Sequence, residues 1–223
     1  MKRKVILVAV CGFYLTILTG QIAAFTVIED GASHLVNNDI YQDKDVFLDF
    51  YIANIPGTHL EIVDGGLIGY DVRAFNNSEV KVSGGSIAVD LWGFGNSTIT
   101  INGGLIGDDI LAYDSSTVTV NGGLIGGELD AYDSGIIYLC GLDFSVDGVP
   151  LNFGDSLRNY GTLNLKGDGW RSGIITGTLQ DGSALNSEFL IEETTTANII
   201  IIPEPATLLL FGLGGLILRK ETI

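Results

Sequence analysis

The sequence predicts an all-β solenoid, a parallel β-helix of 19-residue coils that we expect to be right-handed, and two observations predict it. Gly-Gly pairs begin at positions 65, 84, 103 and 122, at a constant 19-residue interval. Apolar and polar residues also alternate within each copy, as in VTVN and TITIN. A fixed period of about 20 residues is typical of solenoids, and alternation with period two is typical of strands that have one buried face.

The core is predicted from the columns that appear when the four copies are stacked. A 19-residue coil cannot bury its own apolar face, so it must stack on neighbours about 4.8 Å away, where like residue meets like residue. Gly-Gly pairs and tracts rich in Asn, Asp and Ser supply the corners. The predicted buried columns are Ile68, Ile87, Ile106 and Ile125; Val72, Leu91, Ile110 and Leu129; Ala74, Gly93, Ala112 and Ala131; Val80, Ile99, Val118 and Ile137; and Val82, Ile101, Val120 and Leu139.

The N-terminus has the pattern of a secretory signal peptide. The sequence MKRK is followed by the apolar stretch VILVAVCGFYLTILTG and then by QIAA. A basic region, an apolar region and small residues at a cleavage point are the three parts of such a signal. We therefore expect residues 1–24 to be a signal helix that is cleaved after Ala24, and the alternative is an uncleaved membrane helix.

The remaining chain divides into a repeat region and two ends. Residues 25–60 alternate irregularly and are predicted to form opening coils, and residues 61–140 hold the regular repeats. Residues 141–200 are predicted to form a C-terminal β cap, in which two strands flank the turn at Asp181-Gly182. After signal cleavage only Cys140 would remain of the two cysteines, so no intramolecular disulfide is expected.

The net charge of residues 25–202, here called the body, argues against nucleic acid as a partner. Residues 25–202 contain 6 basic residues and 25 acidic ones, a net charge of −19. Such a body repels nucleic acid, because the phosphate backbone is also negative. We therefore expect no nucleic-acid binding.

The C-terminal tail, residues 203–223, ends in an apolar run and a basic pair. Pro203-Glu204-Pro205 is followed by Ala-Thr, by a Leu- and Gly-rich run to Leu218, and by Arg219-Lys220. These residues closely resemble a PEP-CTERM sorting signal, with two basic residues where the family has a longer arginine cluster. The resemblance implies a hydrophobic membrane helix that anchors the chain transiently, an exosortase-type sorting enzyme as partner, and delivery to the cell envelope or outside. The alternative is a permanent C-terminal membrane anchor.

An acidic column also runs through the repeats, formed by Asp71, Asp90, Asp109 and Glu128. Carboxylates about 4.8 Å apart repel each other, and bound calcium would relieve that repulsion. The GGxGxDxUx pattern of calcium-binding repeats is absent from the sequence. We therefore interpret the column as a solvated acidic face without a cofactor, with a calcium site as the alternative.

An aromatic column accompanies it, formed by Phe75, Phe94, Tyr113 and Tyr132. If residues 71, 73 and 75 share the outer face, rings and carboxylates lie side by side, as on many surfaces that bind sugars. If the chain bends at this corner, the rings stack inward instead. The column is therefore a candidate site for an extracellular polysaccharide.

Catalysis has little support in the sequence. Many parallel β-helices act on polysaccharides, but such chemistry needs a bounded cleft with a paired acid and base. No long loop interrupts the repeats, Arg73 is their only arginine, and no GxSxG, HExxH or CxxC occurs. We therefore expect a non-enzymatic structural or adhesive surface protein, with a carbohydrate-binding module as the first alternative and a polysaccharide-active enzyme as the second.

Overall fold

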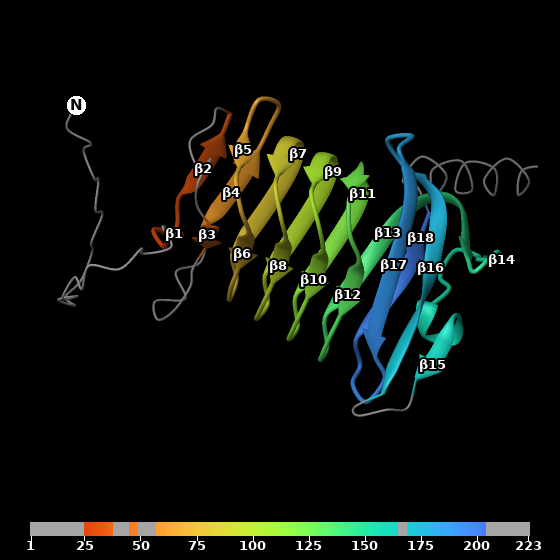
Figure 1. Cartoon of the computed structure of the whole chain (residues 1–223). Helices are drawn as coiled ribbons and strands as arrows, with labels where there is room; N and C mark the ends of the chain where they lie inside the picture. Colours follow the sequence, from red (N-terminus) through yellow and green to blue (C-terminus); the bar gives the residue numbers. More distant parts are fainter. Residues whose placement is uncertain (1–24, 38–44, 49–56, 165–168, 204–223) are drawn as a thin grey trace, which may run out of the picture.

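The repeats form a β-solenoid whose coils stack side by side along one axis (Figure 1). The structure is a computed structural model, and it describes residues 25–37, 45–48, 57–164 and 169–203. The predicted signal helix at residues 1–24 and the predicted hydrophobic helix of the tail lie outside the described residues. Within the described residues, no helix is long and apolar enough to cross a membrane.

Each regular coil contributes one long strand and one short strand. The opening strands are β1 (Phe25–Ile28), β2 (Ser33–Val36), β3 (Asp45–Leu48), β4 (His59–Ile62) and β5 (Leu67–Ile68). The repeat strands are β6 (Val72–Ala74), β7 (Glu79–Ile87), β8 (Leu91–Gly93), β9 (Thr98–Ile106), β10 (Ile110–Ala112), β11 (Thr117–Ile125), β12 (Leu129–Ala131) and β13 (Ile136–Val146).

The strands pair in parallel on two sides of the solenoid. On one side, here called sheet A, the order is β1-β3-β6-β8-β10-β12-β17. On the other side, sheet B, the order is β2-β4-β7-β9-β11-β13-β18. Val72 is paired with Leu91, Leu91 with Ile110, and Ile110 with Leu129. The predicted 19-residue period is therefore confirmed as the register of the sheet.

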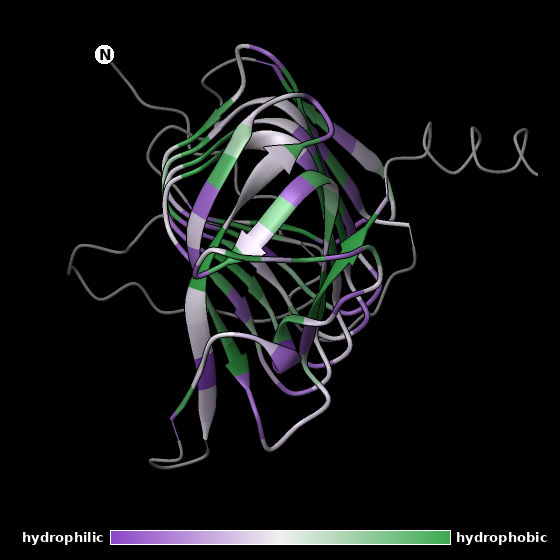
Figure 2. Cartoon of the chain, turned by 90° about the vertical axis from the view of Figure 1, so that its right-hand side faces the viewer, coloured by the Kyte–Doolittle hydropathy of each residue, from purple (hydrophilic) through white to green (hydrophobic). Residues whose placement is uncertain are grey.

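The core lies between the two sheets and follows the predicted columns. Their residues are buried, except that Ile125 is only partly covered. Residues outside the repeats extend the columns at both ends: Val46 precedes Val72, and Phe189 follows Leu129. Hydrophobic and hydrophilic residues alternate along the strands in the view along the stack (Figure 2). Because every inward position is apolar or small, the coils can stack without a disulfide.

The C-terminal end is closed by strands that do not follow the repeat. They are β14 (Val149–Pro150), β15 (Thr162–Asn164), β16 (Trp170–Leu179), β17 (Ala184–Glu192) and β18 (Asn198–Ile202), with a short 3-10 helix at Leu157–Asn159. The two strands expected around Asp181-Gly182 are present, since β16 and β17 pair antiparallel. β17 also pairs with β12, so this hairpin adds to the last coil and covers its edge.

Candidate functional site

The side chains outside sheet A form the candidate site. In β6, Val72 and Ala74 are fully buried and Arg73 between them is half-exposed, so residues 71, 73 and 75 share the outward direction. The same alternation places the acidic column and the aromatic column on this outer face. The arrangement with rings and carboxylates side by side is therefore the one that the structure has.

The acidic column connects successive coils through hydrogen bonds. A carboxylate Oδ1 accepts the backbone N–H of the equivalent residue in the next coil: Asp71 from Asp90 at 3.2 Å, Asp90 from Asp109 at 3.1 Å, and Asp109 from Glu128 at 2.7 Å. Asp45 extends the column by one coil, because its Oδ1 accepts the N–H of Asp71 at 3.2 Å. Asp71 is only 8% exposed. These carboxylates therefore act as acceptors for backbone donors, a role that sequence reasoning missed.

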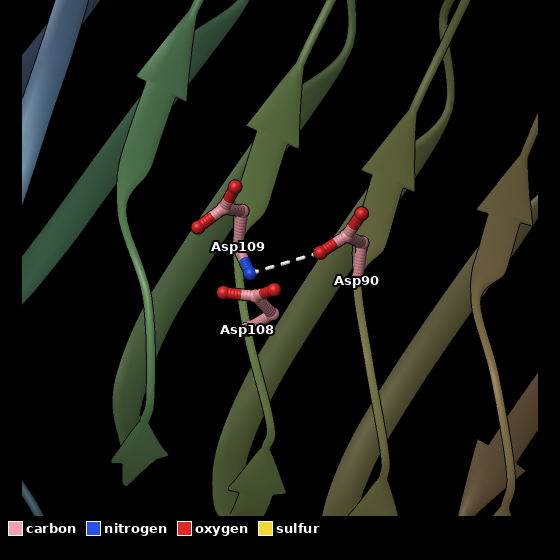
Figure 3. Close-up of side chains that lie close together, drawn as sticks. All are labelled: Asp90, Asp108 and Asp109. Atoms are coloured by element: carbon pink, nitrogen blue, oxygen red, sulfur yellow. Dashed lines mark hydrogen bonds between the residues drawn. The ribbon is translucent and has the colours of Figure 1, made fainter.

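Three carboxylates come close enough together to act as metal ligands. Oxygen atoms of Asp90, Asp108 and Asp109 lie within 4.8 Å of one another (Figure 3). Burial raises the pKa of Asp90, and the neighbouring charges of Asp71 and Asp109 raise it further. Hard oxygen ligands of this kind suit calcium. Asp90 and Asp109 belong to the predicted column, whereas Asp108 does not, and Asp71 and Glu128 are not part of this group.

The aromatic column is a continuous stack of half-buried rings. The centroid distances are 4.8 Å from Phe75 to Phe94, 5.1 Å from Phe94 to Tyr113 and 4.3 Å from Tyr113 to Tyr132, with interplanar angles of 8°, 14° and 1°. Trp170 of the cap closes the stack with its ring edge-on to Tyr132 at 5.5 Å. Because the rings face one another, the inner members present their edges, rather than their faces, to solvent.

Arg73 lies between two further aromatic rings in the column between the acids and the stack. Its guanidinium carbon is 5.1 Å from the Phe47 ring centroid and 5.3 Å from that of Trp92, and Nη2 is 2.6 Å from Asp71 Oδ2. Such cation–π contacts add to the ion pair. Sequence reasoning missed Phe47 and Trp92, although Trp92 follows Arg73 by one period and was therefore detectable.

Asp130 continues this middle column at the junction with the cap. It is 6% exposed, its Oδ2 accepts a hydrogen bond from the Tyr132 hydroxyl at 3.1 Å, and its Oδ1 has no partner among the described residues. Burial raises the pKa of Asp130 to about 7, and the negative charges of Glu128 and Asp109 act in the same direction. Burial also raises the pKa of Tyr132. This carboxyl group therefore changes its charge near neutral pH.

The predicted processing residues lie almost entirely outside the described part of the chain. Pro203 is the last described residue, and its carbonyl oxygen accepts a hydrogen bond from the buried thiol of Cys140 at 3.6 Å. Glu204, Pro205, Arg219 and Lys220 lie outside the described residues, as does the predicted cleavage point at Ala24.

Comparison with known proteins adds one match at the C-terminus. A family model described as the PEP-CTERM protein-sorting motif matches residues 202–220. No curated protein and no solved structure matches the chain. The match covers the same tail whose residues resembled this signal. It indicates recognition by an exosortase-type sorting enzyme and export to the cell envelope. The chain is thus a β-solenoid with 19-residue coils that carries a PEP-CTERM protein-sorting motif.

Proposed function

We propose that this chain is an exported, non-enzymatic protein that acts as a structural or adhesive component of the cell envelope or of extracellular polymer. The sorting motif supports the destination. The observation that carries the structural role is that side chains of the outer face engage one another from coil to coil. Carboxylates accept backbone N–H groups and rings stack on rings along the same axis. A rod reinforced in this way is suited to bearing load at a surface.

The use of the acidic side chains supports a non-enzymatic role. A general acid and base must be free to exchange protons with a substrate held in a cleft. On this face the Oδ1 atoms of Asp71, Asp90 and Asp109 already accept backbone N–H groups. Their geometry therefore favours holding the coils together over proton transfer.

Processing and destination are tested by fractionating the native host and measuring the intact mass of the protein. We expect a species outside the membrane that begins near Phe25 and ends near Pro203. A variant with Glu204→Ala should accumulate in the membrane fraction with its tail retained. A wild-type chain that stays in the membrane with residues 206–223 would make the tail a permanent anchor.

The structural role is tested by deleting the gene and measuring cell adhesion and the cohesion of the extracellular polymer. We expect both to fall and to recover when the wild-type gene is restored. Turnover of a polysaccharide by the purified protein would instead support the enzyme alternative. Unchanged adhesion and cohesion in the deletion strain would contradict a structural role.

Carbohydrate binding is a second candidate, favoured by the position of the aromatic column on the outer face. The half-buried rings of Phe94 and Tyr113 lie in the column next to Arg73 and Trp92. Since ring faces are covered by neighbouring rings, a sugar would meet ring edges and tyrosine hydroxyl groups rather than stack on a face.

The two candidates differ in what the ring variants do. If the role is structural, a folded Tyr113→Phe variant should restore adhesion in the deletion strain and should bind polysaccharide no differently from the wild type. If the column binds sugar through its hydroxyl groups, Tyr113→Phe should weaken polysaccharide pull-down while thermal unfolding is unchanged. Phe94→Ala provides the second test, once its folding has been verified by circular dichroism.

A further inference from the structure

The C-terminal cap is joined to the last regular coil of sheet A through one short strand pair. β17 pairs with β12 over three residues, from Leu129 opposite Phe189 to Ala131 opposite Ile191. In sheet B the cap strand β18 pairs with β13 over five residues. The ladder between β12 and β17 is therefore the shorter of the two, and it is this ladder that covers the edge of β12.

Two glutamates meet across this ladder. Glu128 stands directly before β12 and Glu188 lies on β17, and the register of the two strands places them opposite each other. One position earlier, the Ser187 hydroxyl donates to the carbonyl of Gly127 at 2.5 Å, so the same alignment continues beyond the ladder. Burial raises the pKa of Glu128, and the charges of Glu188 and Asp109 raise it further. Like charges in opposite positions weaken a strand pair.

Asp130 lies in the middle of the same ladder, opposite Leu190. It is 6% exposed, and Leu111 of β10 flanks it on the other side. The Tyr132 hydroxyl donates to its Oδ2 at 3.1 Å, and its Oδ1 has no partner among the described residues. Burying a charged carboxylate with one oxygen unpaired is costly, so this position favours the neutral acid.

The described titratable groups around Asp130 offer it no positive charge. They come from its own strand, from the coil before it and from the cap, and all are acids or tyrosines: Asp109, Tyr113, Glu128, Tyr132, Glu188 and Glu192. β16 adds the ring of Trp170, which is uncharged. The cap arginines Arg158 and Arg171 both pair with Glu193 instead. An ionised Asp130 therefore lies among like charges and apolar side chains.

We propose that the β16–β17 hairpin is a pH-sensitive closure of the last coil, which stays on β12 while Asp130 is protonated and opens more often once Asp130 is ionised. Opening separates Glu128 from Glu188 and gives Asp130 access to water. It also uncovers the edge of β12, whose backbone N–H and C=O groups can then pair with another strand. The closure is a property of the folded chain and does not rest on the proposed role in the envelope.

The direction of the pH response follows from the two states of the hairpin. Burial raises the pKa of Asp130 to about 7 in the closed state, whereas in the open state the pKa returns toward the ordinary value of 3.8. The closed state is therefore favoured fully below about pH 4, and this advantage is lost as the pH rises to about 7. Between about pH 6 and about pH 8 the open fraction should rise about tenfold, because one pH unit of this interval lies below the closed-state pKa.

Hydrogen exchange of the purified full-length chain at about pH 6 and about pH 8 tests the closure, with each rate corrected for the intrinsic pH dependence of amide exchange. We expect the protection of residues 185–192 in β17 to fall about tenfold between the two pH values, while that of residues 98–106 in β9 changes little. In Asp130→Asn, a neutral variant of similar size, β17 should be protected equally at both pH values. Asp130→Leu provides the same test should the Asn variant fold poorly.

Asp143→Asn is the matched control, because it removes one exposed carboxylate from β13 beside the cap and leaves the ladder intact. It should keep the response of the wild type. An unchanged protection of β17 in the wild type, or a response that persists in the Asp130 variants, would overturn the proposal. An equal fall in β9 would overturn it too, because the pH would then act on global unfolding rather than on the hairpin. None of these results depends on whether the protein is sorted or adhesive, so a failure here is distinct from a failure of the proposed function.

Discussion

Asp130 lies where the last repeat coil meets the cap, and its two neighbours in the same column are leucines. Leu111 pairs with Asp130 on one side and Leu190 on the other. At the scale of the residue, this is a carboxyl group in a place that the fold has made apolar. Burial raises its pKa from the ordinary value of 3.8 to about 7. The folded state therefore favours the protonated form, and ionisation of Asp130 destabilises it.

This shift predicts a pH-dependent gain on substitution. Because the folded-state pKa lies above the unfolded one, the carboxyl group costs nothing below about pH 4, its cost grows as the pH rises from there to about 7, and it is constant at higher pH. Asp130→Leu should therefore raise the free energy of unfolding by about 2–4 kcal/mol at about pH 8 and change it little at about pH 4. Urea unfolding of the variant and the wild type at the two pH values measures both changes in the free energy of unfolding. Asp143→Asn, an exposed control, should have little effect, and an equal gain from Asp130→Leu at both pH values would refute the explanation.

The corner residues Asn76, Gly95, Asp114 and Asp133 form a second column that depends on single-residue chemistry. Each has a positive φ, between 54° and 64°, a conformation that glycine, Asn and Asp adopt most readily. Asp114 also accepts the backbone N–H of Gly95 at 2.9 Å through Oδ2. One side chain at this corner therefore provides both a tolerated backbone conformation and an acceptor.

Two substitutions of Asp114 test the role of this corner, because they should differ in stability. Asp114→Ala loses the acceptor and places an alanine at φ 55°, so we expect it to lower the free energy of unfolding by about 1–3 kcal/mol. Asp114→Asn keeps both properties and should lie within about 0.5 kcal/mol of the wild type. Thermal and urea unfolding provide the comparison. Equal stability of the two variants would mean that the corner does not depend on this side chain.

At the scale of the element, the acidic column joins the short strands of successive coils through hydrogen bonds. β6, β8 and β10 have three residues each, and the carboxylate just before each strand accepts a backbone N–H from the next coil. Asp109 accepts from Glu128 and its own N–H donates to Asp90, and Asp71 and Asp90 likewise both accept and donate within the column. The repulsion between neighbouring carboxylates is thereby offset by hydrogen bonds to backbone dipoles.

This role predicts that the amide can replace the acid. Asp109→Asn keeps an oxygen for the Glu128 N–H and removes one charge, so its stability should equal or exceed that of the wild type. Asp109→Ala leaves the N–H without its acceptor and should cost about 1 kcal/mol. Millimolar calcium should leave the melting temperature of the wild type unchanged. A calcium-dependent rise that Asp109→Asn abolishes would instead identify the cluster of Asp90, Asp108 and Asp109 as a metal site.

The contacts of the repeat strands could be predicted from the sequence, whereas those of the opening and cap strands could not. The buried columns were predictable because one 19-residue spacing fixes every register in the repeats. Asp45 was not, because the step from Val46 in β3 to its partner Val72 in β6 is longer than one period. The burial of Asp130 was not predictable either, because Leu190, which pairs with it, and Trp170, which covers its neighbour Tyr132, both come from cap strands that follow no period. The 19-residue period predicts contacts between coils, but it gives no information about contacts made by the cap strands.

At the scale of the whole molecule, the coil is the unit that the fold can gain or lose. Each regular coil contacts the coil before it and the coil after it, so stability is distributed along the stack. Deleting residues 103–121 removes one full 19-residue period and joins Asn102 to Gly122, which restores the Asn-Gly sequence found at both positions. β9 then runs into the second half of β11, and β12 takes the place of β10 on β8.

The shortened chain should fold, because every column keeps its inward or outward direction. Deleting residues 103–120 instead removes one residue fewer and gives a chain of nearly the same composition, so it is the matched control. A shift by one residue turns each later side chain of a strand to the opposite face, which would place Val and Ile in solvent. We expect the first deletion to keep the β-sheet circular dichroism spectrum and a cooperative melt, and the second to be degraded by protease at temperatures where the first survives. Equal resistance of both chains would mean that the corners absorb a one-residue shift, and the fixed interval of 19 would then need an explanation other than register.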